Sequence, residues 1–167
     1  MLKSCPSRWF YFGQGLVVLG LLSFSYYLEW YQGLLPCPLC ELQRLIFLAL
    51  GLSFALAGCF SHRRLRAIFF SLIQMLIAAV GLLVAGRQVW LQYHPASATG
   101  SCDASIYYLF QILPFQDALL SILVGGPECA KVGWQFLHLG IPEWSLIGFL
   151  GFFLLALNQG LACLMRR

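Results

Sequence analysis

Four stretches of the chain lack any charged side chain over about the length that a lipid bilayer requires. They cover residues 9–28, 45–61, 67–86 and 144–165. A membrane span needs about 20 apolar residues, and lipid leaves the backbone little alternative to a helix. Because the second stretch is the shortest, we expect its helix to include residues on its N-terminal side. The sequence therefore predicts one domain over residues 1–167, with spans at approximately 9–28, 42–61, 67–87 and 144–165.

The composition agrees with a protein that lies in lipid. Of the 167 residues, 60% are hydrophobic and 10% are charged, and the mean hydropathy is +0.81. Soluble domains carry about 25% charged residues, so too few charges remain here to cover a water-facing surface. These values exclude a soluble enzyme, a nucleic-acid binder and a disordered chain. The first stretch is longer than the apolar core of a signal peptide, so we expect it to remain as a helix.

The basic residues predict the orientation of the spans. The N-terminal tail, the link between spans two and three, and the C-terminal tail contain no acidic residue, and their basic residues are Lys3, Arg8, Arg63, Arg64, Arg66, Arg166 and Arg167. Basic segments remain preferentially in the cytoplasm, which places both termini there. The loops at approximately 29–41 and 88–143 then face outward.

A fifth span is the main alternative, because residues 104–126 are apolar apart from Asp117. Such a span would separate Cys102 from Cys129 across the membrane and would place the basic C-terminus outside. Pro114 and the Gly-Gly-Pro sequence at 125–127 favour a short helix on the membrane surface instead, over residues 106–123. The predicted fold is thus an all-α bundle of four transmembrane helices with a surface helix in its second outer loop.

This topology divides the seven cysteines into two groups. Cys37 and Cys40 lie in the first outer loop, and Cys102 and Cys129 lie in the second. The remaining cysteines, near the cytoplasmic ends of spans, are Cys5, Cys59 and Cys163. Disulfides persist on the oxidising side of a bacterial membrane and are rare in the cytosol. We therefore expect redox chemistry at the four outward cysteines and reduced thiols at the other three.

The Cys-Pro-Leu-Cys sequence at 37–40 has features that suit thiol chemistry. Pro38 is favoured in the first turn of a helix, and the free N–H groups at that end would stabilise a thiolate. Cys40 and Arg44 are four residues apart, so they share a helix face and Arg44 can supply positive charge. Glu41 acts in the opposite direction, because its negative charge raises the pKa of a nearby thiol.

Other interpretations of these residues stay open at this point. A C-x-x-C pair can be half of a zinc site or a structural disulfide, although zinc requires four ligands in close arrangement. Arg44 can also be an interfacial residue whose charged end reaches the lipid headgroups.

The cysteines and their neighbours form a pattern that resembles a known family. Cys37, Cys40 and Arg44 make a C-x-x-C-x-x-x-R motif, and residues 87–92 read Arg-Gln-Val-Trp-Leu-Gln. A further run, C-x4-W-x-F-L-x-L-x-x-P-x-W, is formed by Cys129, Trp134, Phe136, Leu137, Leu139, Pro142 and Trp144. Together with four spans, these motifs resemble the DsbB family of disulfide bond formation proteins over essentially the whole chain. His138 stands where the family has a small residue such as Gly.

The resemblance implies a quinone-dependent protein-disulfide oxidoreductase of the bacterial inner membrane, with its active cysteines facing the periplasm, that serves a periplasmic DsbA-type thiol oxidase. Electrons would enter at a Cys102–Cys129 disulfide, with Cys102 forming the mixed disulfide with the partner. They would pass to a Cys37–Cys40 disulfide and then to ubiquinone or menaquinone from the membrane quinone pool, bound beside Cys40 and Arg44.

Arg87 and His94 are two further candidates for contact with quinone, because they lie near the outer face in sequence. No metal site is predicted.

Three related or competing functions remain. The chain could be a DsbB paralogue with a dedicated partner, or a relative of vitamin K epoxide reductase, although a C-x-x-C before span two favours the DsbB family. It could also be a small metal-handling or structural membrane subunit, which would tolerate replacement of its cysteines.

Overall fold

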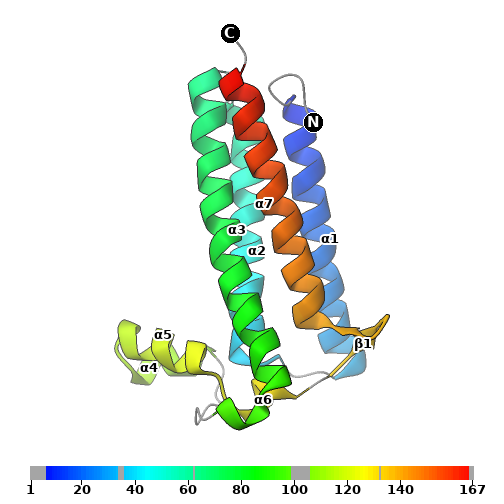
Figure 1. Ribbon diagram of the computed structural model, residues 1–167, viewed down its shortest axis with the longest axis vertical. Helices are drawn as coiled ribbons and strands as arrows, with labels where there is room; N and C mark the ends of the chain where they lie inside the picture. The colour runs from blue at the N-terminus through cyan, green and yellow to red at the C-terminus, as the bar shows by residue number, and fades with distance from the viewer. Residues whose placement is uncertain (1–6, 34–35, 62, 99–105, 132, 166–167) are drawn as a thin grey trace.

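The computed structural model describes residues 7–33, 36–61, 63–98, 106–131 and 133–165. Four long helices form a bundle in which consecutive long helices run in opposite directions (Figure 1): α1 Arg8–Gln32, α2 Pro38–Phe60, α3 Arg64–Tyr93 and α7 Ile141–Met165. Each of the four is long and apolar enough to cross a bilayer. The predicted all-α fold with four membrane-spanning helices is confirmed.

The helices extend beyond the charge-free stretches at the end of the bundle where the second outer loop attaches. α2 begins at Pro38, α3 continues to Tyr93 and α7 begins at Ile141. The backbone hydrogen bonds of a helix can continue through polar residues. The ends of these helices are therefore set by capping residues and prolines, and not by the point where the apolar stretch ends. Cys37 is the N-cap of α2, with Pro38 in its first turn. Pro95 disfavours helical dihedral angles at His94, the C-cap of α3.

The bundle is held together along contacts of α3 with α7, of α1 with α2 and of α2 with α3. At its centre the rings of Phe47 and Phe149 stack with centroids 4.0 Å apart. Gly81 on α3 lies directly against the ring of Phe149, where a Cβ atom would have no room. The absence of a side chain at Gly81 therefore allows α3 and α7 to approach closely.

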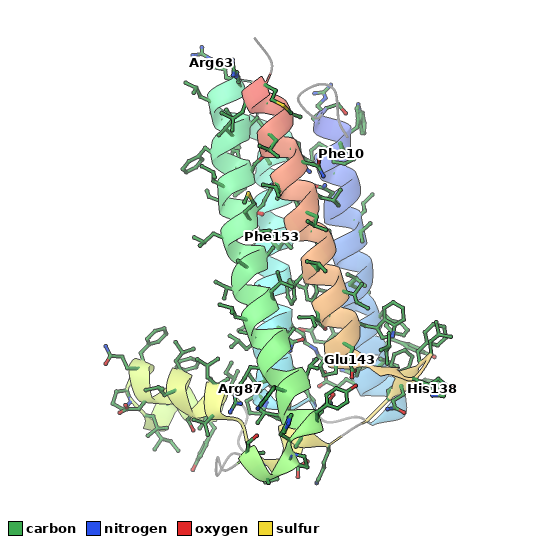
Figure 2. All side chains as sticks on the ribbon, in the orientation of Figure 1. Phe10, Arg63, Arg87, His138, Glu143 and Phe153 are labelled. Carbon is green, nitrogen blue, oxygen red and sulfur yellow. The ribbon has the colours of Figure 1, made fainter. Side chains whose placement is uncertain are left out.

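The two ends of the bundle differ in charge, as the sequence predicts. Arg63 lies at one end, together with the start of α1 and the end of α7, whereas Arg87, Glu143 and His138 lie near the other end (Figure 2). The placement of the first end in the cytoplasm stays a prediction.

The described part of the second outer loop contains the short helices η1 Pro95–Ser97, α4 Ile106–Ile112, α5 Phe115–Val124 and α6 Pro127–Ala130. α4 and α5 extend sideways from the bundle (Figure 1), and each is too short to span a bilayer. The single helix predicted over 106–123 is therefore wrong in detail. Pro114 divides it because proline disfavours helical angles at the residue before it.

A small hairpin that the sequence analysis did not predict precedes α7. It pairs β1 Gln135–Phe136 with β2 Leu139–Gly140 in antiparallel register. Its two-residue loop places Leu137 at φ +54° and His138 at φ +62°, in the left-handed region that favours glycine. This geometry gives a physical reason for a small residue at the position that His138 occupies.

Candidate redox site

Three sulfur atoms meet at the N-terminus of α2. The Sγ atoms of Cys37 and Cys40 lie 3.2 Å apart as free thiols. The side chain of Cys37 is also hydrogen-bonded to that of Cys129, which α6 contributes from the second outer loop. Cys129 is 1% exposed and Cys37 is 8% exposed. Cys37 therefore stands between a sulfur of its own motif and a sulfur from the other loop.

Gly125 allows α6 to reach the start of α2. Its φ of +74° is strained for other residues, and a Cβ atom there would lie 2.5 Å from Leu91 Cδ1 and 3.5 Å from Leu39 Cδ1. Gly126 then caps α6, whose first residue is Pro127. The Gly-Gly-Pro sequence thus turns the chain from α5 into α6 in close contact with α2 and α3.

The thiol of Cys129 has a lowered pKa. The hydrogen bond from Cys37 is the main cause, and backbone hydrogen bonds at Leu39 and Gly126 add to it, so that the pKa falls to about 7 against burial and the charge of Glu128. The same contact, with a smaller contribution from Cys40, raises the pKa of the Cys37 thiol. Leu39 lies in the first turn of α2, so this helix end stabilises negative charge on Cys129.

A pair of buried glutamines lies beside the sulfurs. Nε2 of Gln88, on α3, is 3.0 Å from Cys40 Sγ and 3.4 Å from Cys37 Sγ. Gln43, on α2, donates from its Nε2 to Oε1 of Gln88 at 2.6 Å. Sequence reasoning missed both residues. The available signal was an uncharged polar side chain in an apolar helix, which lipid or a dry core disfavours unless it has a partner.

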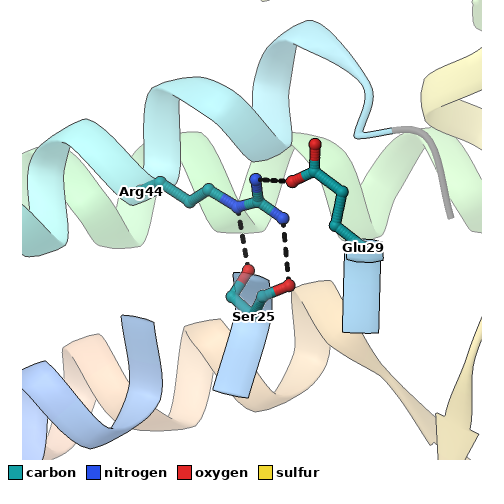
Figure 3. Close-up of polar contacts among 3 residues, drawn as sticks. All are labelled: Ser25, Glu29 and Arg44. Carbon is teal, nitrogen blue, oxygen red and sulfur yellow. Dashed lines mark hydrogen bonds and ion pairs between the residues drawn. The ribbon is translucent and has the colours of Figure 1, made fainter. Parts of the chain in front are cut away.

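Arg44 joins α2 to α1. Its Nε donates to Ser25 Oγ at 2.8 Å, one terminal nitrogen donates to the Ser25 carbonyl at 3.2 Å, and the other pairs with the carboxylate of Glu29 (Figure 3). Its guanidinium also lies 4.7 Å from the ring centroid of Tyr26. With 15% of its side chain exposed, Arg44 is held inside the protein and does not reach out freely to headgroups.

A cavity of about 770 Å³ opens beside this group. Cys37, Cys40, Gln43, Arg44 and Gln88 lie along its polar part. The remaining walls are mainly apolar and aromatic side chains of α1, α7, the hairpin and the segment just before it, among them Leu21, Phe24, Trp134, Phe136, Trp144 and Ile147. A few convergent polar groups in an otherwise apolar pocket of several hundred Å³ are typical of small-molecule sites.

The matched sequence covers nearly the whole chain. The family described as "Disulfide bond formation protein DsbB" matches residues 7–159. The chain belongs to the DsbB family. Its relatives include "Disulfide bond formation protein B" of Marinobacter nauticus, 40% identical over 96% of this chain and 94% of the relative, and that of Hahella chejuensis, 36% identical over 87% and 88%. "Disulfide bond formation protein B 1" of Pseudomonas aeruginosa is 39% identical over 82% of this chain and 84% of the relative. The resemblance found in the sequence is confirmed.

Membership of the DsbB family makes this chain a multi-pass membrane oxidoreductase of disulfide bond formation.

The other two residues predicted for its site, Arg87 and His94, are not among the residues that line the cavity. Arg87 donates to the carbonyl oxygens of Leu123 and Val124 at the end of α5, at 3.0 and 3.1 Å. His94 stacks on Trp90 with ring centroids 4.1 Å apart. Within the described residues, neither lines the cavity, and their contact with quinone stays a prediction.

Of the remaining cysteines of this DsbB-family chain, the structure describes Cys59 and Cys163, and Cys5 lies outside the described residues. Cys102 lies outside the described residues. Cys59 is an exposed free thiol. Cys163 is disulfide-bonded, so the predicted reduced state is wrong for it. The cellular compartment indicates whether thiols are reduced on average. An individual disulfide bond also depends on whether two cysteines lie close enough for their sulfur atoms to bond.

Proposed function

We propose that this protein reoxidises a periplasmic DsbA-type thiol oxidase and passes the electrons to a membrane quinone. The observation that carries the proposal is the position of Cys37, in contact with Cys40 on one side and Cys129 on the other. A sulfur with two neighbours can exchange one disulfide partner for the other. The two loops therefore share one exchange centre.

The exchange between loops is a balanced displacement. The Cys129 thiolate attacks Cys37 Sγ of a Cys37–Cys40 disulfide, so the Cys37–Cys129 bond forms as the Cys37–Cys40 bond breaks. The electron pair of the broken bond remains on Cys40, and no net oxidation occurs in this step. The backbone hydrogen bonds at Leu39 and Gly126, which do not depend on the Cys37 thiol, lower the pKa of Cys129 in this step too and favour its thiolate. The role of Cys102 as the sulfur that pairs with the soluble partner rests on the family resemblance.

The residues at the cavity fit a quinone. Its walls are mainly apolar, as an isoprenoid quinone requires, and Cys40 and Arg44 both line it. When bound, a quinone supplies an acceptor for two electrons and two protons. Ser25 and Glu29 hold the guanidinium group of Arg44 in place, so that its positive charge stays near the part of the cavity wall that contains Cys40. Trp134 and Phe136, whose rings stack with centroids 6.0 Å apart, add an aromatic surface to the cavity wall.

Energetics favour a membrane acceptor over a thiol pool. DsbA-type oxidases as a class have a potential near −120 mV, and thiol buffers of oxidising compartments lie near −180 to −210 mV; these are general values, not properties measured on this chain. Reoxidation of such a partner by a thiol buffer is therefore uphill by about 60–90 mV, or ~3–4 kcal/mol. A stronger oxidant is required, and quinones are available in the bilayer.

The deciding experiment mixes detergent-purified protein with reduced DsbA, with and without ubiquinone. We expect catalytic DsbA oxidation only in the presence of quinone, and its loss in Cys37→Ser, Cys40→Ser, Cys102→Ser and Cys129→Ser. Cys59→Ser is the matched control, because Cys59 is exposed and outside the sulfur group. Quinone-independent turnover, or full activity in the first four variants, would overturn the proposal.

A further inference from the structure

We propose that the side-chain amide of Gln88 is a catalytic thiolate-binding group for Cys37 and Cys40, and that Gln43 is the positioning residue that orients it. This inference rests on the proposed function, because it concerns the exchange step at the same sulfurs.

The geometry allows one amide group to serve both sulfurs. Nε2 of Gln88 carries two N–H donors and lies 3.0 Å from Cys40 Sγ and 3.4 Å from Cys37 Sγ. Gln88 is 2% exposed, so these bonds are largely shielded from competing water. Hydrogen bonds from a buried donor are strongest where charge develops in a low-dielectric site.

Gln43 fixes which end of the Gln88 amide faces the sulfurs. Its own Nε2 donates to Gln88 Oε1 at 2.6 Å, and it is 3% exposed. A reversed Gln88 amide would direct its NH₂ at the NH₂ of Gln43 and its carbonyl oxygen at the sulfurs. An oxygen atom facing a thiolate is repulsive, so the Gln43 bond maintains the donating orientation.

The chemistry of exchange gives this donor a task. As Cys129 attacks Cys37, negative charge leaves Cys129 and develops on Cys40, which becomes the leaving group. The hydrogen bonds of Arg44 go to Ser25 and to Glu29. Besides the backbone of Cys37, the side-chain amide of Gln88 donates an N–H to the leaving sulfur. Its donor therefore stabilises the charge where it forms and lowers the barrier to expulsion of Cys40 from the disulfide.

The test measures the reactivity of the reduced Cys40 thiol, with neither DsbA nor quinone present. The purified protein is reduced with dithiothreitol, the reductant is removed, and alkylation of the Cys40 peptide is followed by mass spectrometry between pH 5 and 10. In Gln88→Leu we expect alkylation at neutral pH to slow by about 10- to 100-fold, as loss of a hydrogen bond to a charged group predicts. The limiting rate at high pH, where the thiolate is fully formed, should not fall, because a thiolate that has lost a hydrogen bond is at least as nucleophilic.

Gln43→Leu should slow alkylation at neutral pH by less than Gln88→Leu does. The double variant should lose no more than Gln88→Leu alone, because Gln43 acts through Gln88. Gln74→Leu is the matched control, since Gln74 is a fully buried glutamine of the same helix, about 21 Å away along its axis. Its alkylation profile should match that of the unmodified protein.

An unchanged pH profile in folded Gln88→Leu overturns the inference, as do additive effects of the two single variants. If Gln88→Leu does not fold, Gln43→Leu decides, and an unchanged profile there overturns the proposed orientation. A changed profile in a protein that does not oxidise DsbA in the presence of quinone would instead count against the proposed function alone.

Discussion

The ionisation of Cys129 depends on its contact with Cys37. That hydrogen bond is the main reason why the pKa of Cys129 falls to about 7. In the reduced protein, alkylation of Cys129 should therefore be half-maximal near pH 7 and should slow as the pH falls below it, because the thiolate is protonated. In Cys37→Ala the midpoint should rise toward the ordinary thiol value of about 8.5. Mass spectrometry of the Cys129 peptide measures both profiles, and identical midpoints would contradict the assignment.

The hairpin loop before α7 holds two residues in an unfavourable backbone conformation. Leu137 and His138 both have positive φ, whereas such two-residue loops favour Asn-Gly. Leu137 is 68% exposed, so replacing it removes little packing. We expect the double variant Leu137→Asn, His138→Gly to unfold at a higher temperature in detergent, with a gain of about 1–2 kcal/mol. A lower unfolding temperature would show that these side chains make stabilising contacts.

At the level of secondary structure, the turn between α5 and α6 controls where Cys129 lies. Gly125→Ala would place a Cβ atom against Leu91 and Leu39 at a positive φ. We expect α6 to shift and turnover with DsbA to fall by about 10- to 100-fold, because a displacement of about 1 Å at a reacting group costs this much. Gly151→Ala is the control, because nothing lies within 4 Å of its added Cβ. Equal turnover in both variants would contradict the role assigned to the turn.

Local sequence rules predicted α2 best and the second outer loop least well. Pro38 and the cysteine before it define the start of α2, because capping depends on neighbours in the chain. The sequence contains Pro114, yet the single helix expected over 106–123 does not include the break that the structure has there. The Leu137–His138 turn was missed because neither residue is typical of a left-handed conformation.

For the whole molecule, orientation in the membrane is the prediction with the widest consequences. Cys59 lies near the end of α2 that is opposite to its sulfur-bearing N-terminus. In intact spheroplasts, a membrane-impermeant maleimide should label reduced Cys129, and should label Cys59 only after the membrane is opened. Cys102 should be labelled together with Cys129. Labelling of Cys102 and Cys129 from opposite sides would exclude the exchange that we propose.

The number of membrane helices, and the position of Cys37, Cys40 and Cys129 at one end of them, follow from the order of residues along the chain. Charge-free length and the need to satisfy every backbone hydrogen bond act along the chain, so they can be read without a structure. The packing of the helices is needed to see that Cys129 contacts Cys37, that Gln43 donates to Gln88, and that Arg44 pairs with Glu29. These contacts join residues on different elements, and they depend on how each helix is rotated and packed against its neighbours, which spacing within one helix does not specify.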